Sequence, residues 1–312
     1  MMLRIGIALG SGSARGWAHI GVLRRLEAAG IVPAVVCGTS MGAIVGGLYA
    51  AGRIVELEAW AKKLTRLRMS RHFDFQFGSG GIIAGRRITA VLAQGYGDTL
   101  IENLPCAFAC VATDVDSGHE VWLRSGRLAE AVRASYAIPG VFPPVARHDR
   151  WLVDGGLVNP VPVSLCRALG ADVTIAVDLR ADRFGPEPGD DGETELAGRG
   201  GPVRDSSGRG FVRSYFKRRH GGLSAFGVLT RSLTIIQDRI AKTRLAEDPP
   251  EVTIRPGVRT IGALEFYRAA DGIAAGADAA EQALPEIHRA IARLGAKSAG
   301  RHDPRPLVEA AQ

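Results

Sequence analysis

One uncharged stretch, residues 31–52, limits most strongly what this chain can fold into. Within it, an apolar run at 33–37 leads through the sequence Gly-Thr-Ser-Met-Gly at 38–42 into a second apolar run at 43–50. This pattern predicts a buried strand, a sharp turn and a buried helix, with Ser40 at the turn. The glycines allow a strained backbone and the close approach of a substrate. Ser40 is therefore a candidate nucleophile, and the chain a candidate serine acyl hydrolase.

The same stretch is long enough to be read as a membrane span. Pro33 and the glycine-rich break at 38–42 interrupt it, and both disfavour one continuous helix. A buried strand followed by a buried helix explains the lack of charge without a membrane.

Apolar periodicity predicts strands that alternate with helices along most of the chain. The predicted strands are 3–9, 32–37, 106–113, 119–123, 151–153, 173–177 and 251–254. The predicted helices are 17–29, 40–51, 54–67, 86–94, 128–136, 162–169, 229–240 and 263–294. This order indicates a layered α/β fold around a largely parallel sheet.

Composition divides the chain into four parts. Residues 1–180 are expected to form the catalytic core, and 181–220 a flexible charged insertion that is rich in glycine and proline. Residues 221–296 are expected to be a C-terminal helical part of the same domain. Residues 297–312 are expected to be a disordered tail.

The formal net charge of +7 suits an anionic surface, such as phospholipid head groups or nucleic acid. Free use of arginine by a GC-rich genome explains the charge equally well. The four cysteines lie in apolar contexts without a CxxC spacing, which favours buried free thiols over a metal site or disulfides. No leader precedes the first predicted strand, so we expect a cytoplasmic protein, with peripheral contact at the inner membrane face left open.

A serine nucleophile needs donors for the oxyanion that forms during attack. The backbone N–H of Met41 is one, because it begins a helix. The glycine-rich turn at 10–16 also closes a strand and opens a helix, so the N–H groups of Gly12 and Ser13 are candidates for the others, with Arg15 holding the turn. A dinucleotide site uses a similar turn, but it needs an acidic residue after the second strand. At that place, residues 37–40, this chain has Cys-Gly-Thr-Ser instead.

The base that activates Ser40 has two candidate types. In an α/β-hydrolase triad a histidine follows the serine, and His220 or His288 has that order. Asp154 follows a predicted strand and precedes Gly155 and Gly156, which let the backbone turn while the carboxylate is aimed. An ordinary Asp-Gly-Gly turn is the alternative for Asp154.

Three motifs together resemble those of the patatin-like phospholipases, in the bacterial branch similar to the neuropathy target esterase catalytic domain. They are Ser-Gly-Ser-Ala-Arg-Gly at 11–16, the Ser40 motif from Gly38 to Gly42, and Asp-Gly-Gly at 154–156. The segments at 131–135 and 139–144 resemble the family as well, so the likeness covers about residues 3–180. It implies a three-layer α/β/α patatin-like fold with a mostly parallel central sheet.

The resemblance also implies a Ser–Asp dyad without histidine, cofactor or metal. In this dyad Ser40 is the nucleophile and Asp154 takes its proton. Gly12, Ser13 and Ala14 form the oxyanion loop, with Arg15 beside it. The family's loop usually has three glycines, and here Ser11 and Ser13 replace two of them. That departure restricts the backbone of the loop. Reduced activity and a catalytically silent protein are therefore alternatives to full activity.

The expected activity is hydrolysis of fatty acyl esters, of the phospholipase A, lysophospholipase or carboxylesterase type. An acyltransferase with the same dyad and a silent regulatory module are the alternatives. The expected partner is a lipid or acyl ester, not nucleic acid. Five apolar side chains would line an entrance to the site or pack within a loop: Phe73, Phe75, Phe77, Ile82 and Ile83. A segment with aromatic and basic residues at 211–219 would touch anionic lipid or be solvated.

Overall fold

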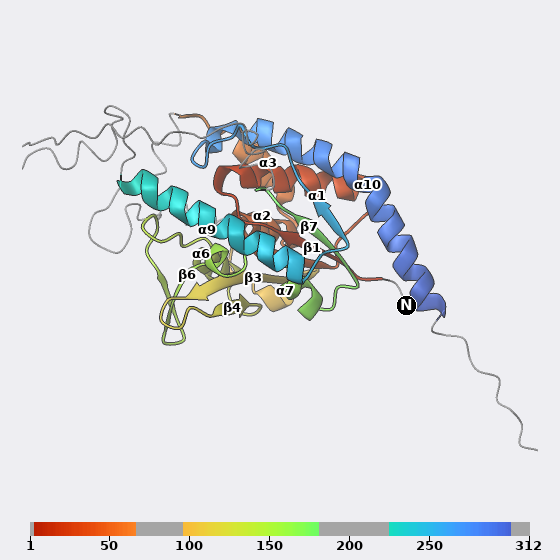
Figure 1. The fold of residues 1–312 in the computed structure, drawn as a ribbon, viewed down its shortest axis with the longest axis horizontal. Coiled ribbons are helices and arrows are strands. Elements are labelled where there is room, and N and C mark those ends of the chain that lie inside the picture. The colour runs from red at the N-terminus through yellow and green to blue at the C-terminus, as the bar shows by residue number, and fades with distance from the viewer. Residues whose placement is uncertain (1–2, 67–95, 181–224, 301–312) are drawn as a thin grey trace, which may run out of the picture.

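The computed structural model describes residues 3–66, 96–180 and 225–300, and its ribbon is drawn in Figure 1. The strands are β1 (Ile5–Leu9), β2 (Val35–Thr39), β3 (Ala107–Asp114), β4 (Glu120–Leu123), β5 (Val145–Arg147), β6 (Arg150–Asp154), β7 (Val173–Val177) and β8 (Val252–Ile254). They form one sheet in the order β5-β6-β3-β2-β1-β7-β8, with β4 paired to β3. The pairs from β3 to β8 along this order are parallel, whereas β4, β5 and β6 join by antiparallel pairing.

The α-helices of the described residues are α1 (Ala18–Ala28), α2 (Met41–Ala50), α3 (Ile54–Lys62), α6 (Leu128–Ser135), α7 (Val163–Ala168), α9 (Ala225–Glu247) and α10 (Ala269–Gly300). Short 3₁₀ helices are η1 (Ser13–Trp17), η2 (Ile101–Asn103), η3 (Gly155–Leu157) and η4 (Phe266–Arg268). The prediction of a mixed α/β fold with a mostly parallel sheet is confirmed.

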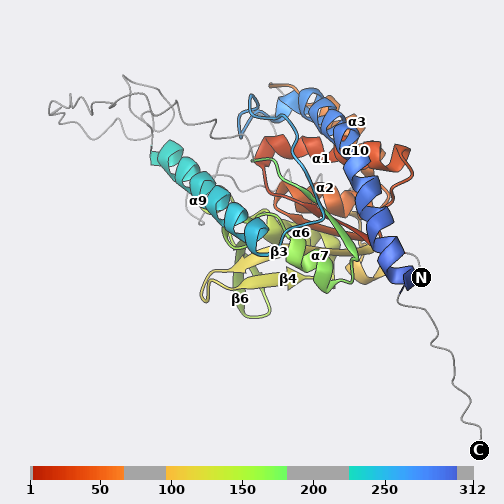
Figure 2. The same cartoon turned by 45° about the vertical axis from the view of Figure 1, so that its right-hand side comes forward.

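Alternating side chains of the parallel strands enter two separate cores, as the period of a strand requires. On β1, Ile7 and Leu9 enter a large core with α1, α2, α6 and α10. Ala8 points the other way, into a smaller core that includes residues of α7 and α9. Figures 1 and 2 show α1 and α10 side by side over one face of the sheet, with α9 on the opposite side of the molecule. The sheet is therefore the middle of three layers.

Several element bounds differ from those predicted. Strand β2 begins at Val35 rather than at residue 32, because Pro33 has no N–H to donate to a ladder. Strand β5 was not predicted, since only three residues form it. Helix α10 begins at Ala269, after η4, and continues to Gly300, into residues expected to form the tail. The helix predicted at 86–94 and the insertion predicted at 181–220 lie outside the described residues.

The four cysteines are free thiols, as the sequence indicated. Cys37, Cys110 and Cys166 are buried, whereas Cys106 is only half-buried. No helix in the described ranges combines the length and the apolar character that crossing a membrane requires.

Candidate active site

Ser40 lies at a strained turn between β2 and α2. Its backbone has φ 57° and ψ −118°, a conformation that side-chain-bearing residues rarely adopt. Gly38 and Gly42 make the turn possible, because a methyl group on Gly38 would overlap the backbone of Gly42, and one on Gly42 would overlap the Leu9 carbonyl. The buried backbone N–H of Ser40 donates to Ser135 Oγ at 3.0 Å. The geometry is that of a nucleophile at a strand-to-helix elbow.

The register of the sheet brings Asp154 to Ser40. Thr39 pairs with Val111 on β3, and the next residue of β3, Ala112, pairs with Asp154 on β6. Strand β3 thus holds the ends of β2 and β6 on its two edges at neighbouring positions. A side chain on Gly155 would overlap the backbone carbonyl group of Val111, so only glycine fits at this position. Residues far apart in the sequence therefore meet because of strand pairing.

The Asp154 carboxyl group is almost completely buried, with 1% of its surface exposed. Its Oδ1 accepts a hydrogen bond from the Gly156 N–H at 2.7 Å. Burial raises the pKa of Asp154 to about 6, although the Ser40 hydroxyl, the Gly156 N–H and the positive charge of Arg180 all favour the ionised form. Among the described residues, Oδ2 has no partner in full hydrogen-bond geometry, so the interaction with the Ser40 hydroxyl is a loose one. That oxygen is free to accept a proton.

The glycine-rich turn at 10–16 lies beside the elbow, because Leu9 on β1 pairs with Gly38 on β2. Gly16 packs directly on Met41, where an added methyl group would overlap the Met41 side chain. In the described part of the chain, the N–H groups of Gly12, Ser13 and Met41 have no hydrogen-bond acceptor. Met41 directly follows Ser40, and Gly12 and Ser13 belong to the turn that packs against Met41 through Gly16.

Two other residues of this turn behave differently from the expectation. The Ala14 N–H donates to the Ala263 carbonyl at 3.1 Å, so it is engaged rather than free. The Arg15 side chain is buried, its pKa is lowered by that burial, and it makes no hydrogen bond within the described residues.

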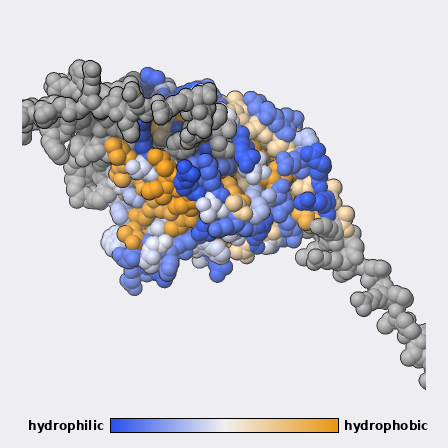
Figure 3. Space-filling view, in the orientation of Figure 1, coloured by the Kyte–Doolittle hydropathy of each residue, from blue (hydrophilic) through white to orange (hydrophobic). Residues whose placement is uncertain are grey.

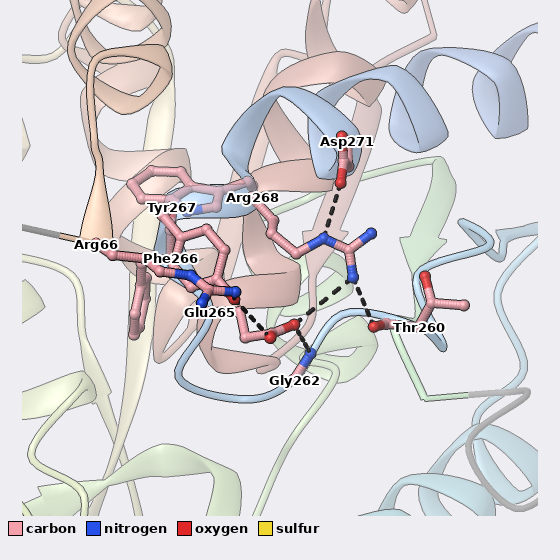
Figure 4. A network of polar contacts seen from close by, with 9 residues as sticks. Arg66, Thr260, Gly262, Glu265, Phe266, Tyr267, Arg268 and Asp271 are labelled. Atoms are coloured by element: carbon pink, nitrogen blue, oxygen red, sulfur yellow. Dashed lines mark hydrogen bonds and ion pairs between the residues drawn. The ribbon is translucent and has the colours of Figure 1, made fainter.

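The turn is supported from outside by the segment before α10. Trp17 Nε1 donates to the Phe266 carbonyl at 3.1 Å, next to the bond between Ala14 and Ala263. Figure 4 shows how polar contacts fix this segment: Glu265 accepts from the Gly262 N–H and the Tyr267 hydroxyl, and pairs with Arg268. The remaining contacts join Arg268 to Thr260 and Asp271, and Arg66 to Tyr267.

Three polar side chains close to this site were not predicted. Arg180 follows β7 and is 2% exposed, and its Nη1 donates to Ser11 Oγ at 3.2 Å. Gln237 of α9 lies next to Ser11, with Oε1 3.4 Å from its hydroxyl oxygen. Ser135 of α6 contacts the elbow as described above. An arginine three positions after an apolar strand was the available signal, and a single sequence does not show which residues surround it.

No histidine in the described ranges is hydrogen-bonded to Ser40. His288 is exposed on α10, and His220 lies outside the described residues. His19 is buried beneath the turn, with Nε2 2.7 Å from the Gly10 carbonyl oxygen. Burial lowers the pKa of His19 to about 4, so it is neutral at pH 7 and takes part in packing. Asp154, in contrast, is a titratable group that the register of the sheet brings next to Ser40.

The surface beside the site includes an apolar region. Figure 3 shows apolar side chains gathered at the position of the N-terminal half of α9. The exposed apolar residues of this helix are Val228, Leu229, Ile235 and Ile236. The expected entrance residues, Phe73, Phe75, Phe77, Ile82 and Ile83, and the segment 211–219 lie outside the described residues.

Comparison with known proteins adds an independent finding. The family model described as "Patatin-like phospholipase" matches residues 7–167. An uncharacterized NTE family protein of Mycobacterium tuberculosis is 34% identical, over 90% of this chain and 91% of its own length. A second such protein of that organism is 33% identical over 91% of this chain, which spans 48% of its length. The lysophospholipase nte1 of Emericella nidulans is 36% identical over 56% of this chain, and the match covers 12% of that protein.

Proposed function

Because the chain belongs to the patatin-like phospholipase family, we propose that it cleaves fatty acyl esters through an acyl-serine intermediate on Ser40. The family assignment makes it a hydrolase of carboxylic esters acting on lipids. The choice of Ser40 and Asp154 as the reacting pair goes further and rests on one observation. Strand pairing brings Ser40, at the start of a helix, next to the buried carboxyl group of Asp154, whose pKa is raised to about 6.

The first half of the proposed reaction forms the acyl-enzyme. Ser40 Oγ attacks the acyl carbonyl carbon, and its proton passes to Asp154 Oδ2. The carbonyl oxygen becomes an oxyanion, which accepts from the N–H groups of Gly12, Ser13 and Met41. The tetrahedral intermediate then collapses, the bond to the leaving alcohol breaks, and Asp154 returns the proton to that alcohol.

The second half releases the acid. Asp154, again ionised, takes a proton from a water molecule as that water attacks the acyl carbon. The ester bond to Ser40 breaks, and the proton returns from Asp154 to Ser40 Oγ. A carboxylate with an ordinary pKa near 4 is a poor base at neutral pH, so the burial that raises the pKa of Asp154 assists both halves.

The proposed substrates are phospholipids, lysophospholipids or simple lipid esters, taken from a membrane or micelle surface. The exposed apolar residues of α9 and the net charge of +7 support peripheral contact with an anionic membrane. Replacing Ile235 and Ile236 with aspartate should weaken binding to anionic vesicles. Val55→Asp, which changes an exposed valine on α3, is the control and should bind as the wild type does.

A fluorophosphonate probe tests the proposed nucleophile, because it reacts only with an activated serine. The wild type and Ser117→Ala, which changes an exposed serine in the turn between β3 and β4, should be labelled. Ser40→Ala should not be labelled, and Asp154→Ala should be labelled slowly. An unlabelled wild type would exclude the proposed activity and favour a silent module.

A panel of lipid esters then identifies the substrate, with Ser40→Ala as the blank. Product analysis in the presence of an added acceptor alcohol separates the two outcomes of the acyl-enzyme. Free fatty acid as the main product supports a hydrolase, and a new ester as the main product would show an acyltransferase.

A further inference from the structure

Three distant segments meet at a buried polar cluster behind the oxyanion turn. Arg180, after β7, donates through Nη1 to Ser11 Oγ at 3.2 Å and to the Gln237 carbonyl at 3.3 Å. The Ser11 hydroxyl oxygen also lies 3.4 Å from Gln237 Oε1. Ser11 and Arg180 are each 2% exposed, so these contacts are shielded from water.

We propose that Arg180 and Gln237 are positioning residues for the Ser40 reaction, because they hold Ser11 and thereby fix the oxyanion turn at residues 10–16. This inference rests on the proposed function. Neither side chain touches the reacting atoms; each acts through the turn or through the Asp154 segment.

The contacts of the turn support this assignment. Leu179 packs against Gly12, since a methyl group on Gly12 would lie 2.6 Å from Leu179 Cδ1. The neighbouring Arg180 bonds to Ser11, so two consecutive residues after β7 contact two consecutive residues of the turn. The Ser11 N–H also donates to the Pro160 carbonyl at 2.9 Å. The backbone of the turn is thus fixed immediately before the free N–H groups of Gly12 and Ser13.

The serine at position 11 has a physical reason in this arrangement. A buried guanidinium group needs acceptors, and burying its charge is costly without them. Arg180 has Asp178 Oδ1 at 3.6 Å, but within the described residues its Nε and Nη2 make no hydrogen bond. The Ser11 hydroxyl supplies an acceptor that a glycine would lack. The departure from a loop of three glycines therefore adds a side-chain tether to the turn.

Gln237 connects the turn to the other half of the dyad. A methyl group on Gly156 would lie 2.7 Å from Gln237 Nε2, so the amide packs against the residue that donates to Asp154 Oδ1. One side chain of α9 thus contacts both Ser11 and the Asp154 turn. A displacement of Gln237 would move the oxyanion donors and the base together.

The charged groups around the cluster define what a pH profile can reveal. Arg180 faces Asp154, Asp178 and Asp238, and the Arg180 charge favours ionised Asp154. His19 is buried nearby and neutral above about pH 4. A change of Arg180 to lysine keeps the charge and loses the planar fork of donors, whereas a change to glutamine removes the charge.

The test measures three variants, Ser11→Ala, Arg180→Lys and Gln237→Leu, against Arg167→Lys as the matched control. Arg167 is half-buried on α7 and bonds to Pro249 and Glu251, away from the turn. The readouts are kcat and KM for a soluble nitrophenyl ester, the rate of fluorophosphonate labelling, and hydrogen exchange of peptides covering residues 10–17. We expect the three variants to lower kcat and labelling by about three- to tenfold, the effect of losing one hydrogen bond, with KM unchanged.

The pH profile separates positioning from a general loss of structure. In Ser11→Ala and Arg180→Lys the acidic limb should stay near its wild-type position, while exchange at 10–17 becomes faster. In a fourth variant, Arg180→Gln, the limb should move to higher pH, because Asp154 loses a neighbouring positive charge. Ser11→Ala removes one hydroxyl and leaves every charge in place, so it keeps the test valid if an Arg180 variant fails to fold.

Two outcomes would overturn the proposal. One is kcat, labelling and exchange of the three variants within about twofold of those of Arg167→Lys. The other is a parallel rise in KM and loss of thermal stability with labelling per folded molecule unchanged. If the wild type itself is not labelled, the proposed function fails, and the exchange data alone decide whether Arg180 and Gln237 hold the turn.

Discussion

Ser135 Oγ lies 3.0 Å from the backbone nitrogen of Ser40 and accepts its hydrogen bond in a fully buried setting. This bond satisfies the buried backbone N–H of the strained elbow residue. The helix that carries Ser135 therefore helps to define the conformation of Ser40, the proposed nucleophile, although it follows the elbow by 95 positions.

Ser135→Ala should remove that acceptor and leave the Ser40 N–H buried and unsatisfied. We expect the free energy of unfolding to fall by about 1–3 kcal/mol, and the rate of fluorophosphonate labelling to fall with it. Urea denaturation and labelling kinetics measure the two effects. Unchanged stability together with unchanged labelling would show that the bond has no role in the elbow.

Activity should depend on the ionisation of Asp154. As the proposed base, Asp154 works only in its ionised form, and burial raises its pKa to about 6. The value of kcat/KM should therefore rise with pH through about 6 and level off above it. A profile of kcat/KM between pH 4 and pH 8 tests this, and a limb near pH 4 would mean that Asp154 is solvated as an ordinary carboxyl group.

Stability should show the opposite dependence on the same group. The pKa of Asp154 is raised from an ordinary value of 3.8 to about 6 in the folded protein, so the folded state binds its proton more tightly than the unfolded state. The protonated carboxyl stabilises the fold below about pH 4, and this contribution is lost as the pH rises to about 6. Above that pH the ionised group costs up to about 3 kcal/mol.

Asp154→Asn should remove this dependence. We expect the stability of the variant, relative to the wild type, to increase between pH 4 and pH 7 by up to about 3 kcal/mol. Denaturation curves at both pH values give the difference, and the change with pH cancels any constant effect of the amide. A constant difference would mean that Asp154 has the same pKa in both states.

Sequence patterns predicted the parts of the site that depend on local structure. Ser40 follows an apolar strand and has glycine on either side at the required spacing, and Asp154 precedes two glycines at the end of another strand. Both signals come from backbone conformations that few residues allow, so they are visible without a structure. The α/β fold was predictable for the same reason, because strand and helix periodicities are local.

The residues that support the proposed Ser40–Asp154 dyad could not be predicted in this way. Ser11 and Gln237 are separated by 226 positions, and the pairing of Ser40 with Asp154 depends on the register of two strands against β3. Ala14 was expected to be a free donor, but its partner, Ala263, comes from a segment next to α10. Contacts of this kind depend on tertiary packing, which a single sequence does not encode in any short pattern.

The strain at Ser40 leads to a prediction about stability. A residue at φ 57° and ψ −118° is better served by glycine, which has no side-chain clash there. Ser40→Gly should be more stable than Ser40→Ala by about 1–3 kcal/mol, while both are inactive. Ser164 in the first turn of α7 is the control, since glycine there should be less stable than alanine, by up to about 1 kcal/mol. Equal stabilities of the two Ser40 variants would argue against a strained elbow.

Glu265 should influence the active site although it is on the surface. Its carboxylate accepts from the Gly262 N–H and the Tyr267 hydroxyl, and it pairs with Arg268, which keeps the pKa of Glu265 below its usual range (Figure 4). These contacts shape the segment whose carbonyl groups, at Ala263 and Phe266, receive bonds from the oxyanion turn.

Glu265→Ala should release that segment without unfolding the protein. We expect faster hydrogen exchange in peptides covering residues 10–17 and a reduction of about two- to fivefold in Ser40 labelling, because small displacements of donors weaken catalysis. Glu281→Ala is the matched control, since it removes an exposed carboxylate that pairs with Arg25 on the far part of α1. Equal hydrogen exchange and equal Ser40 labelling in the two variants would show that the segment before α10 does not control the turn. The bonds from Ala14 and Trp17 would then connect the turn to that segment without affecting its conformation.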